Sequence, residues 1–165
     1  VHFGASPFVG DDIIEDAIRV CRKHGNAIST TDFFLLCGKK NSLDSVEREG
    51  NFSSIYINRD TVACMSTPHA FKYRYIFDLY TKAIKEEIVD RVEPHTTTLM
   101  YEMGEKIYFS KGSQTNIKIT RKEDLDLFFE RLLTDQEFRE KFNIKNNSYN
   151  VLKGKSNIKE YVERL

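Results

Sequence analysis

The chain has 165 residues, enough for one domain with a hydrophobic core. Its 25 basic and 25 acidic side chains balance, which argues against a broad nucleic-acid-binding surface because phosphate-backbone binding needs a net basic stripe. A small basic pocket for one nucleotide or one phosphate stays compatible with this charge. The sequence has no signal-peptide pattern and no apolar run near the roughly 20 residues that span a bilayer, so we expect a soluble, cytoplasmic protein.

A helix followed by a strand is predicted near the start of the chain. Asp11 and Asp12 suit the positive end of a helix, and Gly25 is a typical helix stop. Apolar residues recur between them at helical spacing, which predicts one buried face: Ile13, Ile14, Ala17, Ile18 and Cys21. Residues 26–32 are predicted to be the next strand.

Residues 33–65 are predicted to form an extended β-arm or hairpin. Short apolar pieces at 33–37, 52–57 and 61–65 are separated by a polar, charged segment. Apolar residues on an arm need a surface to cover, so we expect a partner subunit there.

Alternating helices and strands continue after the arm. We expect a helix that begins at Pro68, a short helix over 96–103, a strand over 106–109, an extended piece over 117–120 and a helix over 121–133. In the tail, residues 134–165, we expect a helical piece over 135–142, an Asn-rich break over 143–150 and a last helix from about residue 156. This order predicts the α/β fold class.

Lys118 is the first candidate for chemistry. It alternates with Ile117 and Ile119, so its side chain could face a cleft at the end of a sheet, where α/β proteins bind ligands. A fixed ammonium group there suits a polyphosphate. The alternative is a solvated lysine at the sheet edge.

Two further candidates, Thr67 and Arg59, suit phosphate groups. Thr67 precedes Pro68 at the expected helix start, where a hydroxyl and free amides make a modest anion site, and the alternative is a simple helix cap. Arg59, in the arm, could bind a phosphate through two N–H groups, and the alternative is a surface ion pair.

Cysteine and histidine spacing does not predict a metal centre. The three cysteines (Cys21, Cys37 and Cys64) form no C-x-x-C pair, and we expect reduced thiols. The four histidines (His2, His24, His69 and His95) show no metal-ligand spacing.

Several segments together resemble the sugar- and polyol-phosphate cytidylyltransferase family, which includes the methylerythritol-phosphate and ribitol-5-phosphate enzymes. The matching pieces are Pro7-Phe8-Val9 before an acidic helix start, Asn58-Arg59, the run 67–72 (TPHAFK) and the run 116–125 (NIKITRKEDL). Their order and spacing match the family from Val1 to about Leu133. We therefore expect residues 1–133 to be the C-terminal portion of such a domain, with residues 134–165 as a helical tail of unknown role.

The resemblance implies a Rossmann-like nucleotidyltransferase fold, a three-layer sandwich with a protruding β-arm. It also implies transfer of CMP from CTP to a phosphorylated sugar or polyol, with Mg²⁺ as the divalent ion. By carry-over, Lys118 would contact phosphate near the reacting centre, Arg59 would bind the acceptor phosphate in the neighbouring subunit of an arm-exchanged homodimer, and Thr67 would line the acceptor pocket.

The chain departs from the family pattern at its start. The family has His-Asp-x-x-Arg-Pro-Phe where this chain has residues 2–8 (HFGASPF), so Phe3 stands at the position of the metal-binding aspartate and Ser6 at that of the arginine. Phenylalanine offers Mg²⁺ no oxygen. The resemblance implies that the Gly-rich loop that would bind CTP belongs to an N-terminal half, which we expect to be missing from this sequence.

These departures leave two functional readings. The first is a divergent cytidylyltransferase seen in part, whose isolated C-terminal portion we expect to be inactive. The second is a member without catalytic activity that serves as a binding or dimerisation module. We expect either an N-terminal half or a partner to cover the sheet edge that this portion would expose.

Overall fold

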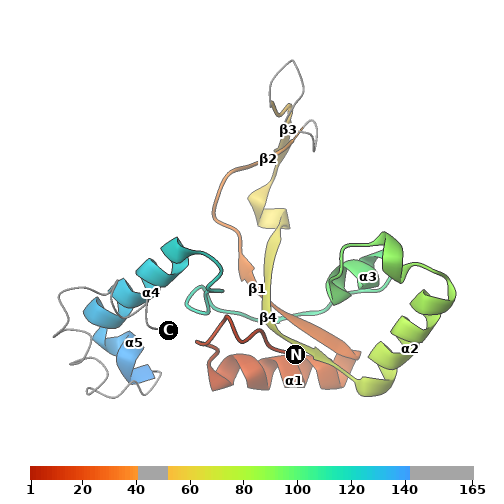
Figure 1. Cartoon of the computed structure of the whole chain (residues 1–165), viewed down its shortest axis with the longest axis horizontal. Coiled ribbons are helices and arrows are strands. Elements are labelled where there is room, and N and C mark those ends of the chain that lie inside the picture. The colour runs from red at the N-terminus through yellow and green to blue at the C-terminus, as the bar shows by residue number, and fades with distance from the viewer. Residues whose placement is uncertain (41–51, 142–165) are drawn as a thin grey trace. The chain divides into compact units, whose positions relative to one another are not determined.

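A computed structural model of the chain describes residues 1–40 and 52–141 (Figure 1). It divides into two compact units, of which the first contains residues 1–2 and 11–114 and the second contains residues 3–10 and those from 115 onward. The expected boundary between residues 133 and 134 stays a prediction. The tail segments expected over 143–150 and from 156 lie outside the described residues.

A three-stranded sheet organises the first unit. β1 (Asn26–Asp32) lies between β4 (Ala63–Phe71), to which it is antiparallel, and β5 (Phe109–Lys111), to which it is parallel. The first four residues of β1 are all buried, as expected for a strand with neighbours on both sides and covered faces. The predicted strand over 26–32 is confirmed, whereas the strand expected over 106–109 begins later, at Phe109.

Helix α1 (Asp11–His24) packs on this sheet through one face. Val20 and Cys21 form a buried cluster with Ala27 of β1. The helix ends at Gly25, whose φ of 96° favours glycine and whose amide donates to the Cys21 carbonyl at 2.8 Å. The predicted helix is confirmed, but Ile14 and Ile18 are 38% and 42% exposed at the margin of the buried face.

The prediction that a helix begins at Pro68 is wrong. Thr67 and Pro68 lie inside strand β4, and helix α2 (Tyr73–Lys85) begins five residues later. β4 pairs with β1 from Ala63 to Phe71 around a register irregularity. A proline, which has no amide to donate, is tolerated in an edge strand or at such an irregularity. Long-range strand pairing therefore overrode the local helix-start signal.

Helices α2 and α3 (Thr96–Glu102) form a second core in the first unit. The buried residues of this core are Leu79, Ala83, Leu99 and Met100. The helix predicted over 96–103 is confirmed. Ala83 and Met100 are fully buried, so this core has little room for rearrangement.

A two-stranded hairpin extends from the ends of β1 and β4 (Figure 1). β2 (Cys37–Lys39) and β3 (Ile55–Ile57) pair antiparallel, followed by a short 3₁₀ turn at Arg59–Thr61. The predicted arm is confirmed in its described parts, residues 41–51 lie outside them, and residues 63–65 belong to β4 instead. Large apolar residues of the arm are more than half exposed: Phe34, Leu35, Leu36, Phe52, Ile55 and Tyr56.

The second unit is built around helices α4 (Lys122–Thr134) and α5 (Gln136–Lys141), which confirm the helices predicted over 121–133 and 135–142. The ring of the buried Phe8 stacks on that of Phe128, with 4.8 Å between the centroids. One carboxylate oxygen of Asp124 accepts hydrogen bonds from the amides of Thr120 and Arg121, at 3.0 and 2.9 Å. This cap satisfies helix-start amides and holds the preceding loop in place.

The described helices are each too short or too polar to span a lipid bilayer. The three cysteines are free thiols, as expected, and burial raises the pKa of the Cys21 thiol.

Asp16 joins α1 to β5. Its carboxylate accepts the Lys111 amide at 2.8 Å and two Arg19 N–H groups at 2.9 and 2.6 Å, and these bonds, led by the one from Lys111, lower the Asp16 pKa. A carboxyl group whose folded pKa lies below its unfolded value stabilises the fold above the unfolded pKa, and this contribution is lost as pH falls through the folded value.

The Asp16→Asn substitution should therefore lower the free energy of unfolding at pH 7 by about 0.5–1 kcal/mol, allowing for solvent screening. The difference from the unsubstituted chain should shrink as pH falls below the unfolded value of 3.8. Urea unfolding between pH 7 and pH 3 measures it, with Asp126→Asn, at an exposed position of α4, as the matched control. A difference that stays constant over this range would contradict the assignment.

Candidate functional site

Main-chain hydrogen bonds bring the first candidate site together in the second unit. The Ser6 amide donates to the Phe3 carbonyl at 2.9 Å and closes a turn. The Ile119 amide donates to the Ala5 carbonyl at 2.7 Å, which ties the loop before α4 to that turn. Residues 3–6 and 117–120 therefore lie side by side although more than a hundred positions separate them.

Lys118 lies over the ring of Phe3. Its ammonium nitrogen is 5.0 Å from the ring centroid, within the range of a cation–π contact. Lys118 is exposed while Ile117 and Ile119 are half-buried, so the predicted alternation of side chains is confirmed even though residues 117–120 form no strand. The ammonium group is thus positioned on one side by the aromatic ring and open to solvent on the other.

The residues at this position do not suit the Mg²⁺ ion that the resemblance implies. Phe3 supplies no oxygen, and Lys118 places a positive charge where a cation would bind. Across residues 1–40 and 52–141, no group of three or more His, Cys, Asp or Glu side chains could hold a metal ion. We therefore derive no catalytic step through a metal bound by this part of the chain.

Ser6, at the position of the family's arginine, is 2% exposed. A small side chain fits this buried place, whereas a guanidinium group would need space and a counter-charge. The second departure from the family pattern is thus accommodated by packing around Ser6.

Thr67 lies in the first unit, inside β4, and is 1% exposed. The anion site expected from helix-start amides at Thr67 is wrong, because no helix begins there. Two residues further along the strand, burial lowers the pKa of His69, which favours the neutral imidazole. A role for Thr67 in lining an acceptor pocket stays a prediction.

Arg59 lies at the base of the arm. One guanidinium nitrogen, Nη1, donates to the Phe34 carbonyl at 3.0 Å. This bond joins the returning limb of the arm to the outgoing limb. Because a guanidinium group has five N–H donors, the contact leaves the planar fork able to bind a phosphate.

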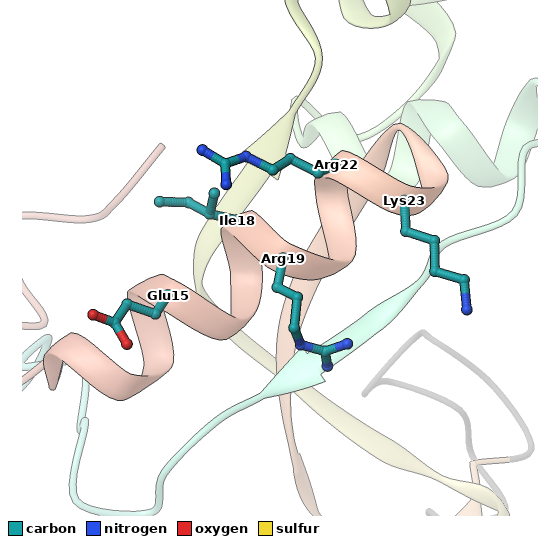
Figure 2. Close-up of a pocket in the computed structure, with 5 residues that line it drawn as sticks. All are labelled: Glu15, Ile18, Arg19, Arg22 and Lys23. Atoms are coloured by element: carbon teal, nitrogen blue, oxygen red, sulfur yellow. The ribbon is translucent and has the colours of Figure 1, made fainter.

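The sequence reasoning did not single out a hollow on the outer face of α1 (Figure 2). The described residues that line it are Glu15, Ile18, Arg19, Arg22 and Lys23. The charged residues among them are spaced three or four apart and lie on the helical face turned away from the sheet, with the partly exposed Ile18 at the margin of that face. In the sequence, this spacing of three basic residues, Arg19, Arg22 and Lys23, was the pattern that could have predicted a basic face on the helix.

The chain matches the family described as "IspD: 2-C-methyl-D-erythritol 4-phosphate cytidylyltransferase" over residues 1–134. It is 33% identical over 128 residues to a ribitol-5-phosphate cytidylyltransferase of Lacticaseibacillus paracasei, covering 78% of this chain and 52% of the relative. It is 35% identical over 127 residues to a 2-C-methyl-D-erythritol 4-phosphate cytidylyltransferase of Clostridium acetobutylicum, covering 76% and 50%.

Solved structures agree with the fold. A 4-diphosphocytidyl-2C-methyl-D-erythritol synthase of Anaerococcus prevotii superposes with a TM-score of 0.64 at 25% identity, over 79% of this chain and 56% of that one. A 2-C-methyl-D-erythritol 4-phosphate cytidylyltransferase of Thermus thermophilus has a TM-score of 0.61 at 20% identity, over 77% and 57%, and supports the fold alone.

The mixed sheet and these neighbours define the α/β, Rossmann-like nucleotidyltransferase fold class, as predicted. The chain belongs to the IspD family of cytidylyltransferases. It spans about half the length of the curated relatives that it matches.

Proposed function

We propose that the protein transfers CMP from CTP to a sugar or polyol phosphate, of the ribitol 5-phosphate or methylerythritol 4-phosphate type, and releases pyrophosphate. The observation that carries this proposal is the family match over residues 1–134, together with a retained, exposed Lys118. Because the chain covers about half of its relatives, the proposal concerns the longest natural form of the protein.

The proposed reaction is a phosphoryl transfer of the nucleotidyl type. An oxygen of the acceptor phosphate forms a bond to the α-phosphorus of CTP, while the bond from that phosphorus to the bridging oxygen of the β-phosphate breaks and its electron pair leaves with pyrophosphate. Such transfers depend on positioning and on neutralising charge as it moves onto the leaving group. The Lys118 ammonium would supply part of that neutralisation.

Arg59 and Thr67 are the proposed acceptor-binding residues. Arg59 would bind the acceptor phosphate in the site of a neighbouring subunit, which requires a homodimer formed through the arm. The exposed apolar residues of the arm, such as Leu35 and Tyr56, support such an interface because a monomer would leave them in water. The expected partners are thus CTP, the acceptor and a second copy of the protein.

A second candidate function is a binding or dimerisation module without catalytic activity. Phe3 and the buried Ser6 favour this reading, because a phenyl ring and a hydroxymethyl group replace the aspartate and arginine of the family pattern. Retention of Lys118, Arg59 and Thr67 favours the enzyme.

Pyrophosphate release by the longest natural form, with CTP, Mg²⁺ and each acceptor in turn, tests the proposal. We expect the Arg59→Ala substitution to raise KM for the acceptor about tenfold or more while KM for CTP stays within about twofold, since a charge-assisted contact to one substrate is lost. Lys39→Ala, an exposed change elsewhere on the arm, is the matched control. A folded dimer that neither binds CTP nor releases pyrophosphate would favour the module.

A further inference from the structure

The Lys118 ammonium lies over the ring of Phe3, which stands where the family pattern has a carboxylate. A carboxylate beside Lys118 would form an ion pair and cancel most of the ammonium charge. An aromatic ring attracts the ammonium through its quadrupole but carries no net charge. The chain therefore keeps a full positive charge at this place and positions it at the same time.

Nothing in the described part of the chain neutralises this charge. The ion pairs of Arg19 with Asp16, Lys111 with Asp12 and Arg131 with Asp135 do not include Lys118. Lys118 is exposed, so its ammonium can meet a ligand without a preceding rearrangement. The turn at residues 3–6 and the bond from Ile119 to Ala5 fix the backbone on both sides of the contact.

We propose that Lys118, held over Phe3, forms a phosphate-binding site that needs no divalent ion, and that this fixed ammonium takes the place of the family's carboxylate-bound metal at this position. The ligand class is a di- or triphosphate, whose closely spaced negative charges gain most from a fixed cation. The inference deepens the proposed function, since it concerns the same site, but it can be tested without any CMP transfer.

Pyrophosphate binding to the 165-residue chain tests the inference. The titration is followed by the ³¹P NMR signal of pyrophosphate, which reports binding in every variant. In chains that retain both residues, the Lys118 side-chain methylene next to the ammonium, whose signal the Phe3 ring should shift upfield, is followed as well. One arm contains Mg²⁺ and the other EDTA, with the free pyrophosphate concentration matched because Mg²⁺ itself binds pyrophosphate. We expect saturable binding in both arms, with dissociation constants that agree within about twofold.

Three substitutions make the result specific to this pair. Lys118→Met should weaken binding at least tenfold in both arms, and Lys118→Arg should retain most of it, which separates loss of charge from loss of folding. Phe3→Leu should weaken binding about two- to fivefold, as expected for one exposed cation–π contact. Lys85→Met, an exposed change on α2, is the matched control and should have no effect.

The Phe3→Asp variant compares a lysine beside an uncharged ring with a lysine beside a carboxylate, and so gives the sharpest test. The new carboxylate should pair with Lys118 and weaken binding in EDTA by about tenfold. A circular dichroism spectrum that matches that of the unsubstituted chain establishes that each variant is folded. Unchanged pyrophosphate binding by Phe3→Asp in EDTA would contradict the inference, because it would show that an uncharged residue at position 3 is not needed for the Lys118 ammonium to bind phosphate.

The remaining outcomes decide between this inference and the proposed function. Binding seen only with Mg²⁺, binding that survives in Lys118→Met, or no saturable shift would overturn the inference even if the longest natural form transfers CMP. Metal-independent binding that depends on Lys118, in a protein that never releases pyrophosphate from CTP, would support the inference and reject the catalytic proposal.

Discussion

The Lys118→Ala substitution is expected to lower the rate of CMP transfer by about 10²–10³-fold in the longest natural form of the protein. The size follows from losing one positive group at the proposed reacting centre, where charge would move onto pyrophosphate. The chain places this group on a defined backbone, over Phe3, with its nitrogen 5.0 Å from the ring centroid. Pyrophosphate release under saturating CTP and acceptor measures the effect on kcat.

Two controls accompany this experiment. Lys118→Arg keeps the charge and should recover a large part of the rate, while Lys85→Ala removes an exposed lysine far along the sequence and should leave the rate unchanged. A Lys118→Ala enzyme that retains more than about a third of the activity would show that Lys118 does not act at the reacting centre.

The Met100→Ala substitution is expected to lower the free energy of unfolding by about 2–5 kcal/mol. Met100 is 0% exposed and packs with Leu79, Ala83 and Leu99 between α2 and α3. The shorter side chain loses its burial and leaves a cavity that the surrounding helices fill only in part. Urea unfolding followed by circular dichroism measures the change.

Met65→Ala is the matched control for Met100→Ala, because it makes the same chemical change at a position that is 44% exposed. It should cost less than about 1 kcal/mol. Equal losses at the two positions would mean that the cluster between α2 and α3 is not a packed core.

Local sequence patterns predicted helices α1, α3, α4 and α5, but placed the start of α2 five residues too early. The helix over residues 11–24 was predicted from its acidic start, its apolar spacing and Gly25, and helices were also predicted over the ranges of α4 and α5. These signals act within one or two turns of a helix, so the residues that determine them are neighbours in the sequence. Ile14 and Ile18 show the limit, since spacing alone does not say how far a buried face extends.

Strand β4 could not be predicted from local signals. Thr67-Pro68 reads as a helix start, yet β4 continues to Phe71 because it pairs with β1, some forty residues earlier. The start of β5 at Phe109 was likewise set by parallel pairing with Ile28. Strand pairing depends on which segments meet in space, which a window of sequence does not contain.

The candidate site likewise has some features that the sequence predicted and others that only long-range contacts set. The alternation around Lys118 and the departures at Phe3 and Ser6 were visible in the sequence. Only the structure put the Lys118 ammonium over the Phe3 ring, because hydrogen bonds between residues distant in the chain bring the two loops together.

The sequence by itself determined the family, the α/β class, helices α1, α3, α4 and α5, and the residue types available for phosphate chemistry, because each depends on residue identity and local spacing. The tertiary structure decided that Thr67 lies in a strand, that Ser6 is buried and that Lys118 rests on an aromatic ring. These features arise from strand pairing and packing between segments far apart in the chain, where long-range contacts outweigh local propensity.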